Sequence, residues 1–187
     1  MAGRGLAGRR LRTTRAPGPL ALRPILAWMA LIAASGTASA QSPDLLSLGG
    51  GAYDTSRNTP RDRAADFRLE YRPVAAAWRD EGIVLRPFAG VEVTSDGAVY
   101  GLGGLSLDLA IGALVLTPSF GAGLYHEGGG KELGSLVEFR STLEIGWRFE
   151  GGGRISLGYG HISNAGITDR NPGTEIITLY WHQPLDW

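Results

Sequence analysis

Residues 135–149 read SLVEFRSTLEIGWRF, and this stretch decides the fold. Bulky apolar side chains stand at odd positions, namely Phe139, Leu143, Ile145, Trp147 and Phe149. Polar or charged side chains stand at even positions, namely Glu138, Arg140, Thr142, Glu144 and Arg148. Because alternate residues of a strand share a face, the pattern predicts a β-strand with one apolar and one charged face.

Seven more segments of the 187-residue chain are strand-like, and each is close to the ~9–11 residues that a tilted membrane strand needs. The eight expected strands are Leu46–Tyr53, Asp66–Trp78, Ile83–Thr94, Ala98–Leu109, Leu114–Tyr125, Ser135–Phe149, Arg154–Ser163 and Glu175–Trp187. Gly-, Asn- and Pro-rich turn signals separate most of them, as at Asn58–Pro60 and Asn171–Gly173. We therefore expect an all-β fold, an eight-stranded antiparallel β-barrel.

The side of the barrel that carries the apolar residues distinguishes two classes of protein. A soluble, lipocalin-like barrel would turn its apolar face inward, and this alternative stays open at the sequence level. The charged faces carry both signs and could pair inside a narrow lumen, where an unpaired charge is costly. The chain also ends on an aromatic residue, Trp187, which resembles the C-terminal recognition signal of bacterial outer-membrane barrels. We therefore expect a transmembrane barrel of the Gram-negative outer membrane, with the barrel-assembly machinery as its partner during biogenesis.

The first forty residues have the pattern of a cleavable secretory signal peptide. Six arginines precede a short apolar run, residues 25–34, and the segment ends on Ala38-Ser39-Ala40. We expect residues 1–40 to be this leader and residues 41–187 to be the barrel domain. All 18 acidic residues but only 12 of the 18 basic residues follow the leader, so the mature net charge is −6. This charge argues against a nucleic-acid partner, and the lack of cysteine excludes disulfides and thiolate metal sites.

The last predicted hairpin contains polar residues on the wrong face. Its connection, residues 161–175, reads HISNAGITDRNPGTE. If both chain ends are periplasmic, this connection is external. His161, Ser163 and Glu175 share the parity of the apolar residues of their strands, so we expect all three to face lipid, where polar groups are costly. A symmetric hairpin centred on Thr168 would place Glu175 directly opposite His161.

These three side chains are the set that nucleophilic ester hydrolysis requires. A serine hydroxyl is a weak nucleophile until an imidazole takes its proton, and a carboxylate orients that imidazole and stabilises its cation. Glu175 lies twelve residues before Trp187, which corresponds to a climb of about 30 Å at ~3.4 Å per residue and ~40° tilt. The set is therefore expected at the outer interface, at the depth of acyl-ester linkages of outer-leaflet lipid.

Residues 161–166, the turn 171–173 and Glu175 resemble the C-terminal signature of the PagL-type lipid A 3-O-deacylases. The resemblance implies Ser163 as the nucleophile, His161 as general base and acid, and Glu175 as the residue that orients His161. It also implies lipid A or lipopolysaccharide as the substrate, hydrolysed at the 3-hydroxyacyl ester of position 3, with no metal and no cofactor.

For the oxyanion, the resemblance favours Asn171, followed by Asn164 and the Gly166 amide. Two alternative functions remain at this stage. The enzyme could be an outer-membrane phospholipase, or the chain could be a non-catalytic small structural barrel in which His161 and Ser163 are an ordinary interfacial pair. The sequence also leaves a homodimer open.

Overall fold

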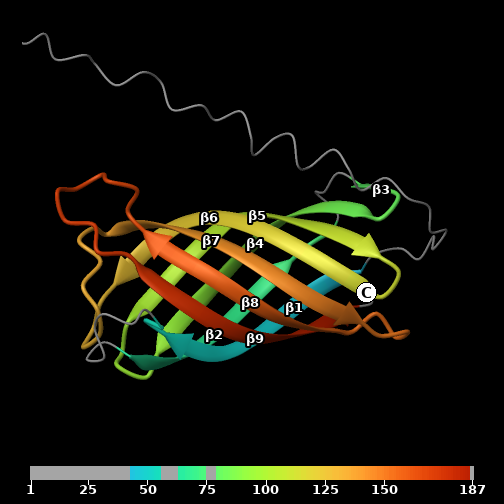
Figure 1. Ribbon diagram of the computed structural model, residues 1–187, viewed down its shortest axis with the longest axis horizontal. Helices are drawn as coiled ribbons and strands as arrows, with labels where there is room; N and C mark the ends of the chain where they lie inside the picture. Colours follow the sequence, from blue (N-terminus) through green and yellow to red (C-terminus); the bar gives the residue numbers. More distant parts are fainter. Residues whose placement is uncertain (1–42, 56–62, 75–78, 186–187) are drawn as a thin grey trace, which may run out of the picture. The chain divides into compact units, whose positions relative to one another are not determined.

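The computed structural model describes residues 43–55, 63–74 and 79–185 (Figure 1). Its strands are β1 Asp44–Tyr53, β2 Ala64–Arg72, β3 Arg79–Asp80, β4 Ile83–Thr94, β5 Val99–Ile111, β6 Leu114–His126, β7 Val137–Arg148, β8 Arg154–Ser163 and β9 Thr174–Leu185. The expected leader, residues 1–40, lies outside the described residues, and so do the Asn58–Pro60 turn and the terminal Trp187.

Eight of these strands close into an antiparallel barrel. Neighbouring strands pair in the order β1, β2, β4, β5, β6, β7, β8 and β9, and β9 pairs back to β1. β3 is a two-residue strand that extends the sheet beside β4. The described ranges contain no helix long and apolar enough to cross a membrane. The predicted eight-stranded all-β barrel is therefore confirmed.

Most strand bounds agree with the sequence expectation to within a few residues, and β4 and β8 agree at both ends. The second strand is the exception, because it was expected to run to Trp78 but ends at Arg72. The next residue is Pro73, which has no N–H to donate to a neighbouring strand and so ends the ladder there. Residues 75–78 lie outside the described residues.

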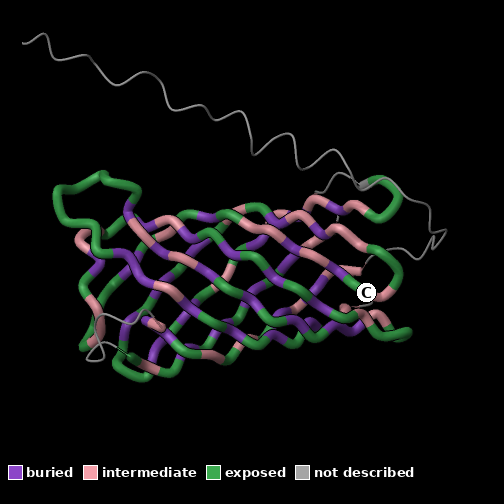
Figure 2. The backbone as a smooth tube through the Cα atoms, viewed as in Figure 1, coloured by how far each residue is buried: buried purple, intermediate pink, exposed green. Residues whose placement is uncertain are grey.

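Burial alternates along the strands in the sense expected of a membrane barrel (Figure 2). Large apolar side chains such as Phe120, Leu124 and Tyr159 are more than half exposed on the outer wall. Charged side chains such as Glu70 and Arg140 are almost completely buried inside. In water this arrangement would expose a continuous apolar surface, whereas lipid covers it. The lipocalin-like alternative, with its apolar face inward, is therefore wrong.

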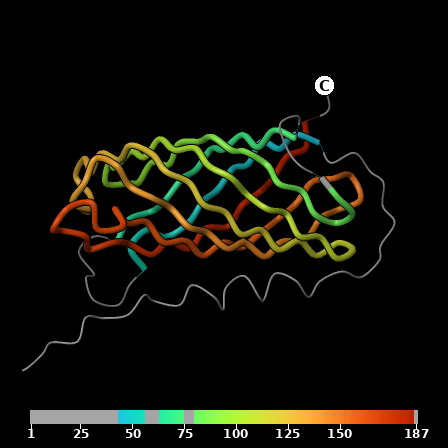
Figure 3. Tube along the Cα trace, turned by 90° about the horizontal axis from the view of Figure 1, so that it is seen from above, coloured from blue at the N-terminus to red at the C-terminus, as the bar shows by residue number. Residues whose placement is uncertain are grey.

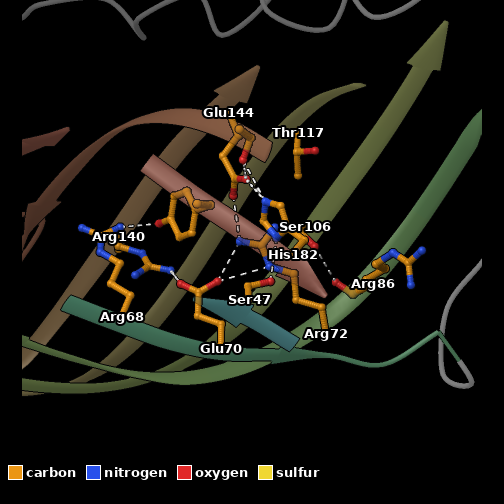
Figure 4. Close-up of polar contacts among 12 residues, drawn as sticks. Ser47, Arg68, Glu70, Arg72, Arg86, Ser106, Thr117, Arg140, Glu144 and His182 are labelled. Carbon is orange, nitrogen blue, oxygen red and sulfur yellow. Dashed lines mark hydrogen bonds and ion pairs between the residues drawn. The ribbon is translucent and has the colours of Figure 1, made fainter. Parts of the chain in front are cut away.

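Paired charges fill the middle of the lumen (Figure 4). Arg72 Nη2 lies 2.7 Å from Glu70 Oε2 and 2.7 Å from Glu144 Oε1. Arg140 pairs with the other carboxylate oxygen of Glu70. These contacts confirm the predicted lumen pairing for Arg140 and Glu144. Arg148 differs from that expectation, because its guanidinium donates to the Gly112 carbonyl in the β5–β6 turn.

We call the end of the barrel with the connections after β1, β4, β6 and β8 the outer end. An apolar cluster fills the lumen near this end, and it contains Tyr53, Phe88, Ala98, Tyr100, Leu102, Tyr125, Leu133, Ile162 and Ile176. Leu133 comes from the connection between β6 and β7, so an outer loop contributes to the core. The interior is thus occupied by side chains, as expected for eight strands.

Candidate active site

The connection between β8 and β9 lies at the outer end of the barrel, where the trace passes from orange to red (Figure 3). The register of this hairpin brings His161 and Glu175 together. The two residues are directly paired across the strands, as the symmetric hairpin predicted. His161 Nδ1 lies 3.5 Å from Glu175 Oε1. Their side chains are 44% and 29% exposed, so both open onto the outer wall of the barrel and not onto the closed lumen. The predicted register and facing of this pair are therefore confirmed.

Ser163 is the last residue of β8 and lies two positions beyond His161 on the same outward face. Together with its neighbours it borders a groove of about 190 Å³ on the outer wall. The residues lining this groove are Phe120, Phe139, Ser141, His161, Ser163 and Ala165. The serine, the imidazole and an apolar trough therefore lie next to one another on the surface that faces lipid.

The position of the Glu175 carboxylate assigns different tasks to the two imidazole nitrogens. With Nδ1 directed toward the carboxylate, the remaining nitrogen, Nε2, is the one that can take a proton from a nucleophile. A separation of 3.5 Å is longer than an ordinary hydrogen bond. Catalytic contacts are commonly loose without substrate and tighten in the complex. The arrangement fits a base with its orienting carboxylate.

The three residues expected near the oxyanion have different hydrogen bonds. The Asn164 side chain is fully buried, and its Oδ1 accepts from the Gly166 N–H at 2.9 Å. Both Asn164 Oδ1 and the Gly166 amide are therefore engaged in holding the loop. Asn171 Oδ1 accepts from the Asn164 N–H at 3.1 Å, and this bond orients the carboxamide without using its Nδ2. Of the three, only Asn171 has a side-chain donor, Nδ2, that these loop hydrogen bonds leave unused.

Asn164 also ties the β8–β9 hairpin to the neighbouring outer loop. Its Nδ2 donates to the carbonyls of Leu133 and Arg170, at 3.2 and 2.8 Å. Thr168 Oγ1 donates to the Gly134 carbonyl at 3.0 Å. Leu133 is buried and Gly134 is its neighbour, so the β6–β7 loop braces the connection that follows Ser163. No pattern in the sequence indicates this contact between loops that are far apart along the chain.

We expect Asn164→Ala to loosen this loop. The substitution removes several buried hydrogen bonds worth ~0.5–1.5 kcal/mol each, which should lower the free energy of local opening by roughly 2 kcal/mol. Amide hydrogen exchange at residues 164–170 should then become about 30-fold faster, as followed by mass spectrometry. Peptides from β6 in the same sample provide the internal reference. Unchanged exchange at Gly166 would contradict the bracing role of Asn164.

A second serine, histidine and glutamate meet inside the lumen (Figure 4). His182 Nδ1 lies 2.7 Å from Ser47 Oγ, and His182 Nε2 lies 3.2 Å from Glu144 Oε2. These distances are shorter than in the surface set. However, all three side chains are fully buried among the lumen ion pairs, where no ester can reach them. Burial therefore assigns this set to the interior and leaves the surface set as the candidate active site.

Sequence reasoning missed several residues around the site. Phe139 and Ser141 have the outward parity of their strand, but only the β7–β8 register shows that they lie opposite Ser163 and His161. Phe120 joins them from β6, and its ring stacks on Phe139 at a centroid distance of 6.0 Å. Among the described residues, no group of three or more His, Asp or Glu side chains is close enough to hold a metal ion.

Comparisons with known proteins agree with the fold and the motif. A curated lipid A deacylase PagL from Bordetella bronchiseptica is 41% identical over 49 residues, which span 26% of this chain and 28% of that protein. The crystal structure of the outer membrane enzyme PagL superposes with a TM-score of 0.58 at 20% identity, over 75% of this chain and 99% of that one. This second likeness establishes the fold.

The family profile described as lipid A 3-O-deacylase (PagL) matches residues 64–184, which is most of the barrel. Together with the closed barrel, this match confirms the outer-membrane location expected from the sequence. The chain therefore belongs to the PagL family of lipid A 3-O-deacylases.

Proposed function

We propose that this barrel is a serine ester hydrolase that cleaves the 3-hydroxyacyl ester at position 3 of lipid A in the outer leaflet. The observation that carries the proposal is the pairing of His161 with Glu175 on the lipid-facing wall, with Ser163 on the same face beside an apolar groove. Family membership supports the substrate class.

The proposed reaction begins with proton transfer from Ser163 Oγ to His161 Nε2 while Oγ attacks the ester carbonyl carbon. The carbonyl oxygen becomes an oxyanion, to which Asn171 Nδ2 donates. His161 then gives its proton to the departing 3-oxygen of the sugar, and an acyl-serine remains. Water attacks this ester in a second round with the same proton transfers, which releases the 3-hydroxy fatty acid. Throughout, the Glu175 carboxylate stabilises the imidazolium.

All three side chains come from a single hairpin of a single chain, so the proposed reaction requires no second copy of the protein. The remaining partner is expected during biogenesis. After removal of a leader at Ala40, the barrel-assembly machinery would insert the strands into the outer membrane. The C-terminal aromatic that motivates this step, Trp187, lies outside the described residues.

The deciding experiment is the acyl pattern of lipid A from cells with and without the protein, followed by mass spectrometry. We expect loss of one 3-hydroxyacyl chain from lipid A and release of the free 3-hydroxy fatty acid. Cells that express Ser163→Ala at equal barrel level provide the control and should keep the original pattern. Unchanged lipid A beside new lysophospholipid would instead assign a phospholipase. If neither lipid changes, the chain is a non-catalytic barrel.

A further inference from the structure

The turn before β9 brings bare backbone against the catalytic imidazole. Gly173 directly precedes β9 and is buried. A Cβ atom built on it would lie 2.8 Å from Cε1 and 3.2 Å from Nε2 of His161. Separations below 3.0 Å are essentially never seen for real Cβ atoms, so the ring or the turn would have to move.

The edge of the ring that meets Gly173 is the edge that the reaction needs. His161 Nδ1 is directed toward Glu175, and Cε1 joins Nδ1 to Nε2, so the Cε1–Nε2 edge that meets Gly173 includes the nitrogen that Glu175 does not contact. The same added Cβ would lie 3.3 Å from the Ile162 carbonyl oxygen, so backbone atoms also limit the space on that side. A methyl group on residue 173 therefore does not fit between the His161 ring and the Ile162 carbonyl without a shift of one of them. It would press against the nitrogen that exchanges the proton with Ser163.

Backbone conformation alone does not account for this contact. Gly173 has φ +61°, a left-handed value that favours glycine wherever it occurs. Gly112, in the β5–β6 turn at the other end of the barrel, has φ +60° but has nothing within 4 Å of an added Cβ. Both glycines have a left-handed backbone, but of the two only Gly173 also lies where a side chain would collide with His161.

We propose that Gly173 is a positioning residue, whose missing side chain leaves the slot in which the His161 imidazole lies between Glu175 and Ser163. This inference rests on the function proposed above, because it gives the imidazole its role as base. Gly173 itself touches no reacting atom of the substrate in this scheme. It acts through the placement of His161.

The test compares Gly173→Ala with the matched variant Gly112→Ala. Both alanines carry the same left-handed backbone cost, and both proteins are first shown to fold by heat-modifiable migration on gels. With purified lipopolysaccharide in detergent, we expect kcat of Gly173→Ala to fall about a hundredfold, the effect of misplacing a catalytic group by roughly 1 Å. KM should stay unchanged, and Gly112→Ala should keep the wild-type kcat.

A double-mutant cycle shows whether the effect passes through His161. In a His161→Ala background, measured over long incubations, adding Gly173→Ala should lower the residual rate no further. A second hundredfold loss there, or a wild-type kcat for Gly173→Ala, would overturn the proposal. So would failure of Gly173→Ala alone to fold, since Gly173 would then serve the barrel and not the base.

Ser163→Ala, assayed in parallel, separates this inference from the proposed function. If Ser163→Ala is inactive and Gly173→Ala is fully active, the positioning role fails and the ester hydrolase stands. If Ser163→Ala is fully active, the proposed mechanism fails and the positioning role fails with it.

Discussion

Ser163→Ala is expected to abolish measurable deacylation, with a fall in kcat of about four to six orders of magnitude. The alanine has no hydroxyl to attack the ester, and loss of the nucleophile alone costs serine hydrolases nearly the whole advantage of the catalytic set. What remains comes from binding and from stabilisation of the oxyanion. Release of 3-hydroxy fatty acid from lipopolysaccharide in detergent micelles, followed by mass spectrometry, measures the loss.

Ser95→Ala is the matched control for this variant. Ser95 follows β4 at the outer end of the barrel, is exposed, and lies in a different hairpin. The same atom is removed at the same end of the molecule, and the wild-type rate should persist. Near-normal deacylation by Ser163→Ala would show that another residue supplies the nucleophile.

Glu144→Ala is expected to destabilise the barrel by about 3–5 kcal/mol, because removing one partner of a buried ion pair leaves the other charge uncompensated. Here the Arg72 guanidinium would lose the Glu144 carboxylate, 2.7 Å away, and would keep only Glu70, which it shares with Arg140 (Figure 4). Ser156 and His182 would lose a hydrogen-bond partner as well. Urea unfolding in micelles, followed by tryptophan fluorescence, gives the change in free energy.

The control for this variant is Glu150→Ala, in the exposed turn between β7 and β8. It removes the same charge and should leave the urea midpoint unchanged. Deacylation per folded molecule should also stay at the wild-type level for Glu144→Ala, because the lumen set is separate from the outer wall. An unchanged midpoint for Glu144→Ala would mean that the lumen ion pairs contribute nothing to stability.

The sequence predicted the barrel and the register of its last hairpin because both follow from local periodicity. Alternation along residues 135–149 established which side chains face lipid, and the equal arms around Thr168 placed Glu175 opposite His161. The facing and pairing are confirmed, whereas the catalytic roles stay predictions. Pro73 was the one local signal overlooked, and it ends β2 early.

The other parts of the site depend on contacts between residues far apart in sequence, which periodicity does not encode. The brace between Asn164 and Leu133 joins two loops 31 residues apart. The groove needs the register of β7 against β8, which sets Phe139 beside Ser163. The sequence predicts Gly173 as a turn residue, but only the folded structure shows that it lies against the His161 ring.

The filled interior has a consequence for how a molecule would arrive at the groove. Because the groove opens sideways on the outer wall, an amphiphile would enter it by travelling within the leaflet and would leave along the same plane. The rate at which the groove is occupied would then depend on the mole fraction of the amphiphile in the surrounding leaflet and on the viscosity of that leaflet. The concentration of the amphiphile in the surrounding water would have little influence, because the encounter would occur by lateral diffusion in two dimensions.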